Sequence, residues 1–470
     1  MSALSDRLRG IIGAPQSGAA GTGSQITWSG SRIPAESQVP AESQVPAESR
    51  IPAESQILAE SRIPTESQVP TESRFLAESQ IPTESQIPNP ESRDLSCLAG
   101  EWRGGCFVVE RRYERGACYG HEPVGTLWSR LAAAADEAPL VAGGAPARLP
   151  FVFFDLETTG LSGGAGTYAF LVGCASFDEE GAFVTRQFLL TRFTDEKPLL
   201  AAVAAELARA GALVSFNGKS FDAPVLETRY LYHRLPWAAG QVPHVDVLHP
   251  ARRFWRDEQE MASCSLVSLE RQILGARRVG DVPGFEIPAR YFQFVRSGEA
   301  RPLAAVLEHN RLDLLSLAGL TARLLHLIRR GPGAAKDARE ALALGRVYMR
   351  AGLEARACDA FQQAADRSSA HGAVRIESLR ALALAWRRAR QHERAAACWS
   401  ALLNAPACPR HVAREATDAL AIHHEHRVRD LAVAKGFALR SLESGVHPAS
   451  HAAVRHRLAR IERKMSSRLL

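Results

Sequence analysis

Acidic residues stand at three well-separated places in this 470-residue sequence. The first holds Asp155 and Glu157, which close the apolar segment PFVFFDLET and precede Thr158, Thr159 and Gly160. Because strand side chains alternate, residues two apart point to the same face, so these carboxylates are expected to converge at a sheet edge. An Asp-x-Glu pair alone arises by chance about once in a chain of this length, so its weight comes from its context.

The other two places lie further along the chain. In residues 215–222 (SFNGKSFD), Asp222 falls in the first turn of a predicted helix, where the dipole also favours an ordinary capping acid, and Asn217 fits a turn equally well. In residues 308–317 (EHNRLDLLSL), His309 and Asp313 are four apart and share one helix face. Such a pair is more often a surface interaction than a site.

Together these residue types suit phosphodiester cleavage. Mg²⁺ prefers oxygen ligands and keeps several waters, so carboxylates on separate elements would hold it well. Two ions about 3.5 to 4 Å apart stabilise both the attacking and the leaving oxygens. Cleavage also needs a base near the attacking water, and histidine has a suitable pKa.

The elements that must position these residues follow an α/β pattern. After the strand that starts at residue 151, the sequence predicts strands at 168–177, 183–190 and 212–216 and around Val245, with helices at 197–210 and 220–234. We therefore expect a mixed sheet flanked by helices. Residues 97–149 are expected to be a lead-in packed on this domain, with a strand pair formed by 106–111 and a segment at Tyr113, then a helix at 126–135.

The chain after Gly331 is rich in Ala, Leu and Arg and is predicted to be helical. Three stretches share a spacing of small and aromatic residues and repeat every 38 residues: Leu344, Gly345, Tyr348, Ala357, Phe361 and Ala364; Leu382, Ala383, Trp386, Ala395 and Trp399; and Leu420, Ala421, His424, Val433 and Phe437. The offsets are those of tetratricopeptide repeats. Residues 336–470 are thus predicted to form a tetratricopeptide-like domain that either offers a partner surface or only packs on the catalytic domain.

The N-terminal part differs from everything after it. Residues 33–86 are nine hexapeptides such as IPAESQ, with proline in seven of them, and the pattern degenerates by residue 92. Proline blocks helix interiors and sheet ladders, so 33–92 is predicted to be a disordered, extended spacer. A binding array that presents repeated Glu-Ser is the alternative. Residues 1–32 are expected to be a short helix followed by disorder.

Composition excludes several classes of protein. Hydrophobic residues make up 46% and charged residues 23%, as in soluble globular proteins. No stretch could span a membrane, and no apolar segment follows the charged start as a signal peptide would require. Eight cysteines without metal-site spacing indicate reduced thiols in a cytoplasmic protein. The net charge of +6 is concentrated in residues 336–470, where 24 basic residues face 13 acidic ones. That surplus would either attract nucleic acid or keep a helical surface solvated.

The three acidic motifs resemble those of the DEDD, ribonuclease-H-like 3′-5′ exonucleases. More narrowly, DLETTGLSGGAGTYAFLVG, SFNGKSFDAPVLETR, DVLHPARRFW and EHNRLDLLSL, followed by tetratricopeptide-like helices, resemble the bacterial YprB-type branch. The resemblance covers roughly residues 97 to 445. It implies a ribonuclease-H-like domain at 150–331, nucleic acid as substrate and two divalent cations, Mg²⁺ or Mn²⁺.

The resemblance also implies roles for individual residues. Asp155, Glu157, Asp222 and Asp313 would be catalytic metal ligands, and His309 would orient or deprotonate the attacking water. Thr158 and Asn217 would lie near the terminal nucleotide of the substrate. One departure affects the base: His309 stands four residues before Asp313, which is the spacing of the tyrosine-type exonucleases rather than the histidine type.

Residues between the second and third motifs have less certain roles. Asp246 follows a predicted strand, and we expect it to support the structure or the ligands. Five arginines, Arg252, Arg253, Arg256, Arg277 and Arg278, would either guide a phosphate backbone or solvate the surface. The sequence therefore predicts a metal-dependent nuclease. The rival hypothesis is a nucleic-acid-binding or scaffold protein whose ribonuclease-H-like fold has little catalytic activity and whose basic helices bind the partner.

Overall fold

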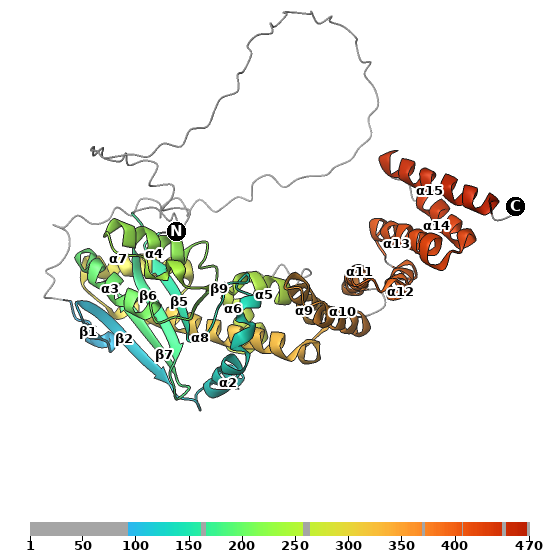
Figure 1. The fold of residues 1–470 in the computed structure, drawn as a ribbon. Helices are drawn as coiled ribbons and strands as arrows, with labels where there is room; N and C mark the ends of the chain where they lie inside the picture. The colour runs from blue at the N-terminus through green and yellow to red at the C-terminus, as the bar shows by residue number, and fades with distance from the viewer. Residues whose placement is uncertain are drawn as a thin grey trace, which may run out of the picture. The chain divides into compact units, whose positions relative to one another are not determined.

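A computed structural model describes residues 93–160, 166–256, 264–368, 372–406, 408–443 and 448–467. The predicted spacer at 33–92 and the N-terminal segment at 1–32 lie outside the described residues. From residue 93 onwards the chain passes from an α/β region into a run of helices, drawn from blue to red in Figure 1.

A seven-stranded mixed sheet organises the α/β region, with the order β1-β2-β7-β6-β5-β8-β9. Its strands are β1 (Glu101–Arg103), β2 (Cys106–Tyr113), β5 (Phe151–Thr158), β6 (Ala169–Phe177), β7 (Phe183–Leu189), β8 (Ala212–Ser215) and β9 (His244–Asp246). The neighbours of β5 differ in direction, because β6 is antiparallel to it and β8 is parallel. A separate short hairpin consists of β3 (Cys118–Tyr119) and β4 (Glu122–Pro123).

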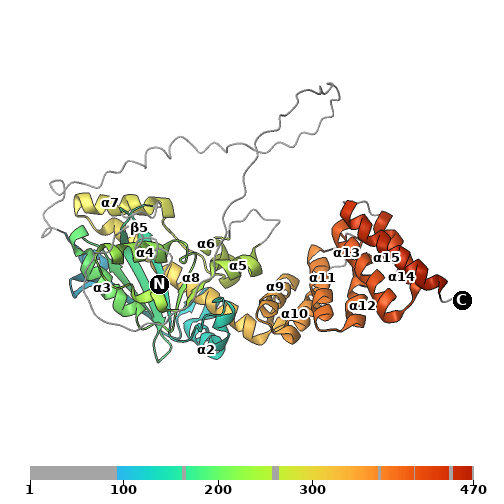
Figure 2. The same cartoon turned by 45° about the horizontal axis from the view of Figure 1, so that its top comes forward.

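Helices cover the sheet and continue beyond it (Figures 1 and 2). The longer ones in this region are α2 (Val124–Ala134), α3 (Glu196–Leu207), α4 (Asp222–Tyr232), α5 (Leu248–Trp255), α7 (Ile287–Ser297) and α8 (Arg301–Arg330). The short ones include α6 (Leu266–Leu269), the π-helical turn η8 (Glu270–Leu274) and the 3-10 turn η9 (Gly284–Glu286). The predicted mixed sheet flanked by helices is therefore confirmed.

Strand β5 is central because both of its faces are covered. Phe151, Val152, Phe153 and Phe154 are all buried, and they divide between two hydrophobic clusters. Such a continuous apolar run suits a strand that is packed on both sides. The polar residues come only at its carboxyl end, where the strand leaves the core.

The lead-in differs from the sequence-based expectation. Residues 106–111 and the Tyr113 segment do not pair with each other, because both belong to β2. β2 pairs instead with β7, with Val109 opposite Gln187, and so extends the main sheet. The first four residues of β2 are buried and the rest are mostly half-buried, so its local pattern changes partway, as it would at the boundary between two strands. Its partner lies some 80 residues away in sequence and is found only through the tertiary structure.

Seven further helices follow the α/β region: α9 (Ala338–Arg350), α10 (Glu354–Arg367), α11 (Ala373–Arg388), α12 (His392–Leu403), α13 (Arg410–His423), α14 (Leu431–Glu443) and α15 (Pro448–Ser466). Consecutive helices pack as hairpins in the order of the predicted repeats. Helices α9 and α10 approach each other closely at Gly345, since a Cβ atom there would lie 2.4 Å from the Phe361 ring. The prediction of tetratricopeptide type depends on family likeness as well as on helix order.

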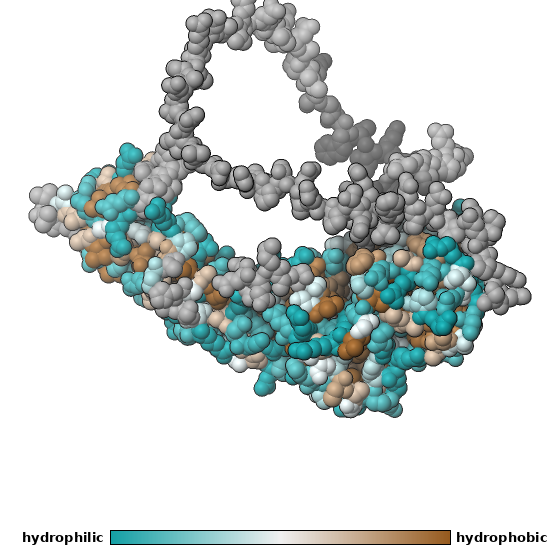
Figure 3. Space-filling view, turned by 180° about the vertical axis from the view of Figure 1, so that it is seen from behind, coloured by the Kyte–Doolittle hydropathy of each residue, from teal (hydrophilic) through white to brown (hydrophobic). Residues whose placement is uncertain are grey.

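On the face of the molecule drawn in Figure 3, apolar residues of the described surface lie among hydrophilic ones. Figure 3 shows hydrophilic residues over most of the visible described surface, with hydrophobic residues interspersed. Within the described ranges, no helix combines the length and the apolar character needed to cross a membrane. All eight cysteines fall in those ranges, and each is a free thiol.

Candidate metal centre

Asp155 and Glu157 point from the carboxyl end of β5, where both side chains are half-buried. In the antiparallel pairing with β6, Asp155 is opposite Gly173 and Glu157 is opposite Leu171. The register shifts immediately after Glu157, so a bulge ends the regular ladder at that point. Strand β5 thus places two carboxylates on one face of the sheet just before the regular pairing ends.

Asn310 of α8 holds Asp155 in place. Its Nδ2 donates a 2.9 Å hydrogen bond to Asp155 Oδ2, and its Oδ1 accepts one of 2.9 Å from Gln187 Nε2. Gly173 makes this possible, because a Cβ atom there would meet Asn310 Oδ1 at 2.2 Å. Asp155, Gly173 and Gln187 face one another across three adjacent strands, and the buried amide lies over that row.

Asp222 begins α4 directly after the turn that follows β8, and it is only 6% exposed. Asp246, at the end of the neighbouring strand β9, accepts hydrogen bonds from the backbone N–H groups of Asn217 (2.8 Å) and Lys219 (3.2 Å). It therefore shapes the turn that leads to Asp222, in keeping with the supporting role expected for it. Gly218 allows the tight fit, since a Cβ atom there would lie 2.8 Å from Asp222 Oδ2.

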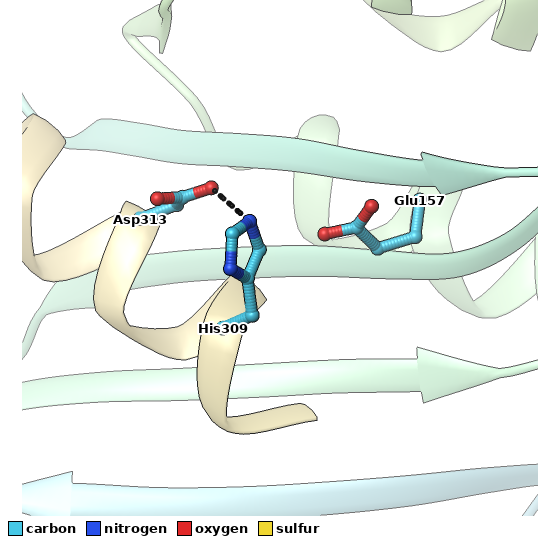
Figure 4. A group of neighbouring side chains, drawn as sticks. All are labelled: Glu157, His309 and Asp313. Atoms are coloured by element: carbon cyan, nitrogen blue, oxygen red, sulfur yellow. Dashed lines mark ion pairs between the residues drawn. The ribbon is translucent and has the colours of Figure 1, made fainter. Parts of the chain in front are cut away.

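His309 and Asp313 lie one turn apart on α8 and face β5. One atom each of Glu157, His309 and Asp313 could serve as a metal ligand, and these three atoms lie within 4.8 Å of one another. His309 Nε2 is 3.4 Å from Asp313 Oδ2, and Figure 4 draws the imidazole ring between the two carboxylates. The structure thus brings together residues that are more than 150 positions apart in sequence.

A buried arginine lies behind this group. Arg278 Nη2 donates to Asp313 Oδ1 at 2.5 Å and to Glu270 Oε2 at 2.7 Å, and Nη1 reaches Asp281 Oδ2 at 3.2 Å. Its side chain is only 4% exposed. The fully buried Glu270 also accepts from Ser316 Oγ of α8. For Arg278, surface solvation is therefore excluded, and the guanidinium fixes the loop at 278–281 to the face of α8 that carries His309.

The site concentrates negative charge. Burial raises the pKa of Asp155 and of Glu157 well above their usual values, and the charges of Asp313 and Asp222 raise both further. Burial, then the charges of Asp246 and Asp313, raise the pKa of Asp222 to about 7. Burial raises the pKa of Asp313 as well, although Arg278 beside it opposes the shift. These mutual effects require the four carboxylates to lie near one another.

Two of the four carboxylates have no protein counter-charge. Among the described residues, neither Glu157 nor Asp222 takes part in an ion pair or a side-chain hydrogen bond. Buried ionised carboxylates are costly unless they are paired or coordinate a metal. Oxygen atoms from three elements, with one imidazole nitrogen beside them, form a donor set that fits a divalent cation.

Thr158 directly follows Glu157 at the end of β5, and Asn217 lies in the turn before α4. Thr158 is buried at the end of β5, and its Oγ1 donates to the Gly160 carbonyl at 2.9 Å. Asn217 adopts a left-handed conformation with φ of 69°, and its side chain is exposed on the turn before α4. Their predicted contact with a terminal nucleotide stays a prediction.

Three contributors to the site escaped the sequence analysis. These are Asn310, Asp281 and Glu270, and of the three only Asn310 departs from the residue pattern around it. It occupies the apolar stripe of α8 that contains Leu303, Leu307, Leu314 and Leu317, where a buried polar residue is out of pattern. Asp281 and Glu270 lie in a segment of short helices and turns, and nothing in its sequence pattern marks them.

Similarity to known proteins agrees with this geometry. Residues 152–325 match the family model of the RNase_H superfamily. The matched range runs from β5 into α8, so the ribonuclease-H-like fold expected for this part of the chain is confirmed. The match ends before α9, and the tetratricopeptide-like character of the later helices therefore stays a prediction.

A curated relative supports the narrower resemblance over part of the chain. "Uncharacterized protein YprB" of Bacillus subtilis (strain 168) is 39% identical over 199 residues. The aligned part makes up 42% of this chain and 47% of the relative, so the chain spans about half the length of that curated protein. The similarity to YprB concerns this aligned part.

Proposed function

We propose that this protein is a metal-dependent nuclease that hydrolyses phosphodiester bonds of single-stranded DNA or RNA, as a 3′-5′ exonuclease. The observation that supports the proposal is that ligand atoms of Glu157, His309 and Asp313 lie within 4.8 Å of one another, with Asp155 and Asp222 near enough for their charges to affect or be affected by this group. Two of these carboxylates lack any protein partner among the described residues, as a site prepared for cations requires.

Two divalent cations, Mg²⁺ or Mn²⁺, fit this donor set, and when bound they would stabilise charge on the attacking and leaving oxygens. The protein's own contribution is to fix the ligands. Asn310 orients Asp155, Arg278 holds one oxygen of Asp313, and Asp246 shapes the turn before Asp222. Without the cations, burial and then the charges of neighbouring carboxylates raise the pKa values of these groups.

A groove beside the site suits a nucleic-acid strand. Its volume is about 710 Å³, and its lining includes Arg278 and Asp281, which touch Asp313 and His309. Arg271 and Arg277 also line it, both are exposed, and within the described chain neither forms an ion pair. Arginine forks bind phosphate bidentately, so these two residues would hold the backbone of the substrate.

The remaining assignments depend on the sequence resemblance and on composition. We assign catalysis to residues 150–331 and a tetratricopeptide-like role to 336–470, whose basic surplus would contact nucleic acid or a protein partner. Eight free thiols fit a reducing compartment, so we place the protein in the cytoplasm. The 3′-5′ direction and the preference for single strands come from the likeness to DEDD exonucleases.

The direct test uses single-stranded DNA and RNA labelled at the 5′ or the 3′ end, with Mn²⁺ or with a chelator. We expect a ladder that shortens from the 3′ end, its loss with chelator, and its loss in Asp155→Ala. Asp366→Ala, which removes an exposed carboxylate of α10, is the matched control and should keep full activity. A ladder that persists in Asp155→Ala would reject the nuclease assignment, and internal cutting would reject the exonuclease direction.

Thermal stability separates the nuclease from the rival binding protein. Any ligand that binds only the folded state stabilises it, by about 2.7 kcal/mol at a concentration 100 times its Kd. We therefore expect Mn²⁺ to raise the melting temperature of the wild-type protein. A melting temperature indifferent to Mn²⁺ would favour a scaffold that binds nucleic acid through its basic helices.

A further inference from the structure

The hydrogen bond between His309 and Asp281 determines which ring nitrogen faces the site. His309 Nδ1 lies 2.7 Å from Asp281 Oδ1, so Nδ1 carries the proton of this bond. Asp281 is itself fixed from two sides, by Arg278 and by the backbone N–H of Val282 at 2.9 Å. Nε2 is consequently the nitrogen that points toward Asp313.

The second oxygen of Asp313 faces that nitrogen. Arg278 occupies Oδ1, and Oδ2 lies 3.4 Å from His309 Nε2. With Nδ1 donating to Asp281, an unprotonated Nε2 would be an acceptor, as Oδ2 is, so the two atoms could bind one cation between them. Two ligands that are each about 2.1 Å from one ion lie about 3 to 4 Å apart, which is the spacing seen here.

Glu157 completes the arrangement from the opposite side. Its carboxylate lies within 4.8 Å of the ligand atoms of both His309 and Asp313, and no described residue pairs with it. Figure 4 shows the three side chains coming from β5 on one side and from two turns of α8 on the other. One nitrogen and two oxygens thus lie close enough to one another to share a metal ion.

We infer that His309 binds one divalent cation through Nε2, together with Glu157 and Asp313, and that Asp281 is the positioning residue that holds the ring in this orientation. The inference rests on the proposed function, because it concerns the same metal centre. It differs from the water-activating role that the sequence resemblance implies, since an imidazole bound through Nε2 and donating through Nδ1 has no free nitrogen to accept a proton.

A nitrogen ligand changes which cation the site prefers. Carboxylate and water ligands suit Mg²⁺ and Mn²⁺ alike, whereas imidazole favours transition metals over Mg²⁺. A histidine whose other nitrogen donates to a carboxylate is a common arrangement at metal sites, and loss of that carboxylate typically lowers metal affinity 10- to 100-fold. The centre should therefore bind Mn²⁺ more tightly than Mg²⁺, with Asp281 contributing to the difference.

Electron spin-echo spectroscopy of the Mn²⁺-loaded full-length protein tests this directly, because it detects a ¹⁴N nucleus bonded to the ion. We expect nitrogen modulation in the wild type and its loss in His309→Gln. His326→Gln, which changes another histidine of α8, should keep it. Titration should show Mn²⁺ affinity about 10- to 100-fold lower in Asp281→Asn, with partial recovery in Asp281→Glu and little change in Mg²⁺ affinity for His309→Gln.

The possible outcomes separate the inference from the proposed function. Bound Mn²⁺ without nitrogen modulation would overturn the ligand role of His309 and leave the nuclease proposal standing. Unchanged Mn²⁺ affinity in Asp281→Asn would overturn the positioning role of Asp281. Failure of the wild type to bind Mn²⁺ at all would overturn the nuclease proposal itself.

Discussion

Two glutamates of low exposure differ in whether basic side chains pair with them. They are Glu157 in the sheet and Glu425 in the C-terminal helices. Glu157 has no partner among the described residues, and burial with its acidic neighbours raises its pKa. Glu425, in a π-helical turn (His424–Val428), is completely buried and accepts from Arg460 and from Lys464 at 2.7 to 2.8 Å. Hydrogen bonds from Arg460 lower the pKa of Glu425 to about 2.

The difference shows that buried charges stabilise the fold in one region of the chain and are available to a ligand in another. In the C-terminal helices the charge of Glu425 strengthens the fold, because its counter-charges come from Arg460 and Lys464 of the neighbouring helix α15. At the end of the sheet the carboxylates repel one another, and for Asp313 the charges of Arg278 and His309 oppose that repulsion. A protein keeps such an arrangement at a site whose ligand supplies the missing charge.

Glu157→Gln should have the largest effect, and it should act on function alone. We expect the rate of phosphodiester hydrolysis to fall about 10³-fold or more, since a metal ligand is lost, whereas the metal-free protein should be no less stable. Steady-state kinetics and thermal melting in chelator measure the two quantities. A variant that melts clearly lower without metal would show that Glu157 has a structural partner, and the comparison would fail.

Glu425→Gln should lower stability and leave activity unchanged. Breaking a buried charge pair is strongly destabilising, and the partial exposure of Arg460 and Lys464 reduces the cost to about 2 to 3 kcal/mol of unfolding free energy. Activity per folded molecule should not change. Denaturant unfolding gives the free energy.

The same variant has a defined pH signature. Because the pKa of Glu425 is lowered in the folded state, from 4.5 to about 2, its stabilisation is complete above pH 4.5 and is lost as the pH falls from 4.5 toward 2. The gap in unfolding free energy between wild type and Glu425→Gln should therefore narrow over that interval. A constant gap would indicate that packing, rather than charge, accounts for the loss.

Asp222→Asn should stabilise the metal-free protein at neutral pH, by about 1 to 3 kcal/mol. The raised pKa of Asp222, about 7, means that ionisation opposes folding, so the wild type loses stability as the pH rises from about 4 to 7 in chelator. The variant should show a smaller decline, because only Asp155, Glu157 and Asp313 would then ionise at raised pKa values, and Mn²⁺ should stabilise it less than the wild type. Melting curves with and without Mn²⁺ distinguish it from a variant that is merely misfolded, which would melt lower in both.

The smallest changes in stability are expected from substitutions of two glycines in the C-terminal helices. Gly345→Ala should destabilise by about 1 to 3 kcal/mol, because the new Cβ atom would meet the Phe361 ring at 2.4 Å. Gly436→Ala in α14, where nothing lies within 4 Å, should stabilise by about 0.5 to 1 kcal/mol through helix propensity. Equal effects in thermal melting would contradict the close packing of α9 on α10.

Several strands could be predicted from the sequence because the residues that define each one are close together in the chain. The strands at 168–177 and 183–190 match β6 and β7 to within one residue at each end, since apolar runs bounded by glycine and polar turns define them. The strand at 106–111 was assigned to the wrong partner, because the choice of β7 over a nearby segment depends on the whole sheet. The acidic motifs were found because each has its own local context.

The sequence by itself determined the order of the strands from residue 151 to residue 246, the places of four carboxylates along the chain and the excess of positive charge after residue 336, because each follows from residue type and spacing. The tertiary structure decided what surrounds those carboxylates. Arg278 and Asp281 reach the site from a segment without a recognisable pattern, and Asn310 bonds to Asp155 only because Gly173 leaves room for it. Such contacts join positions 28 to 155 residues apart, and their geometry exists only once the sheet and α8 have packed together.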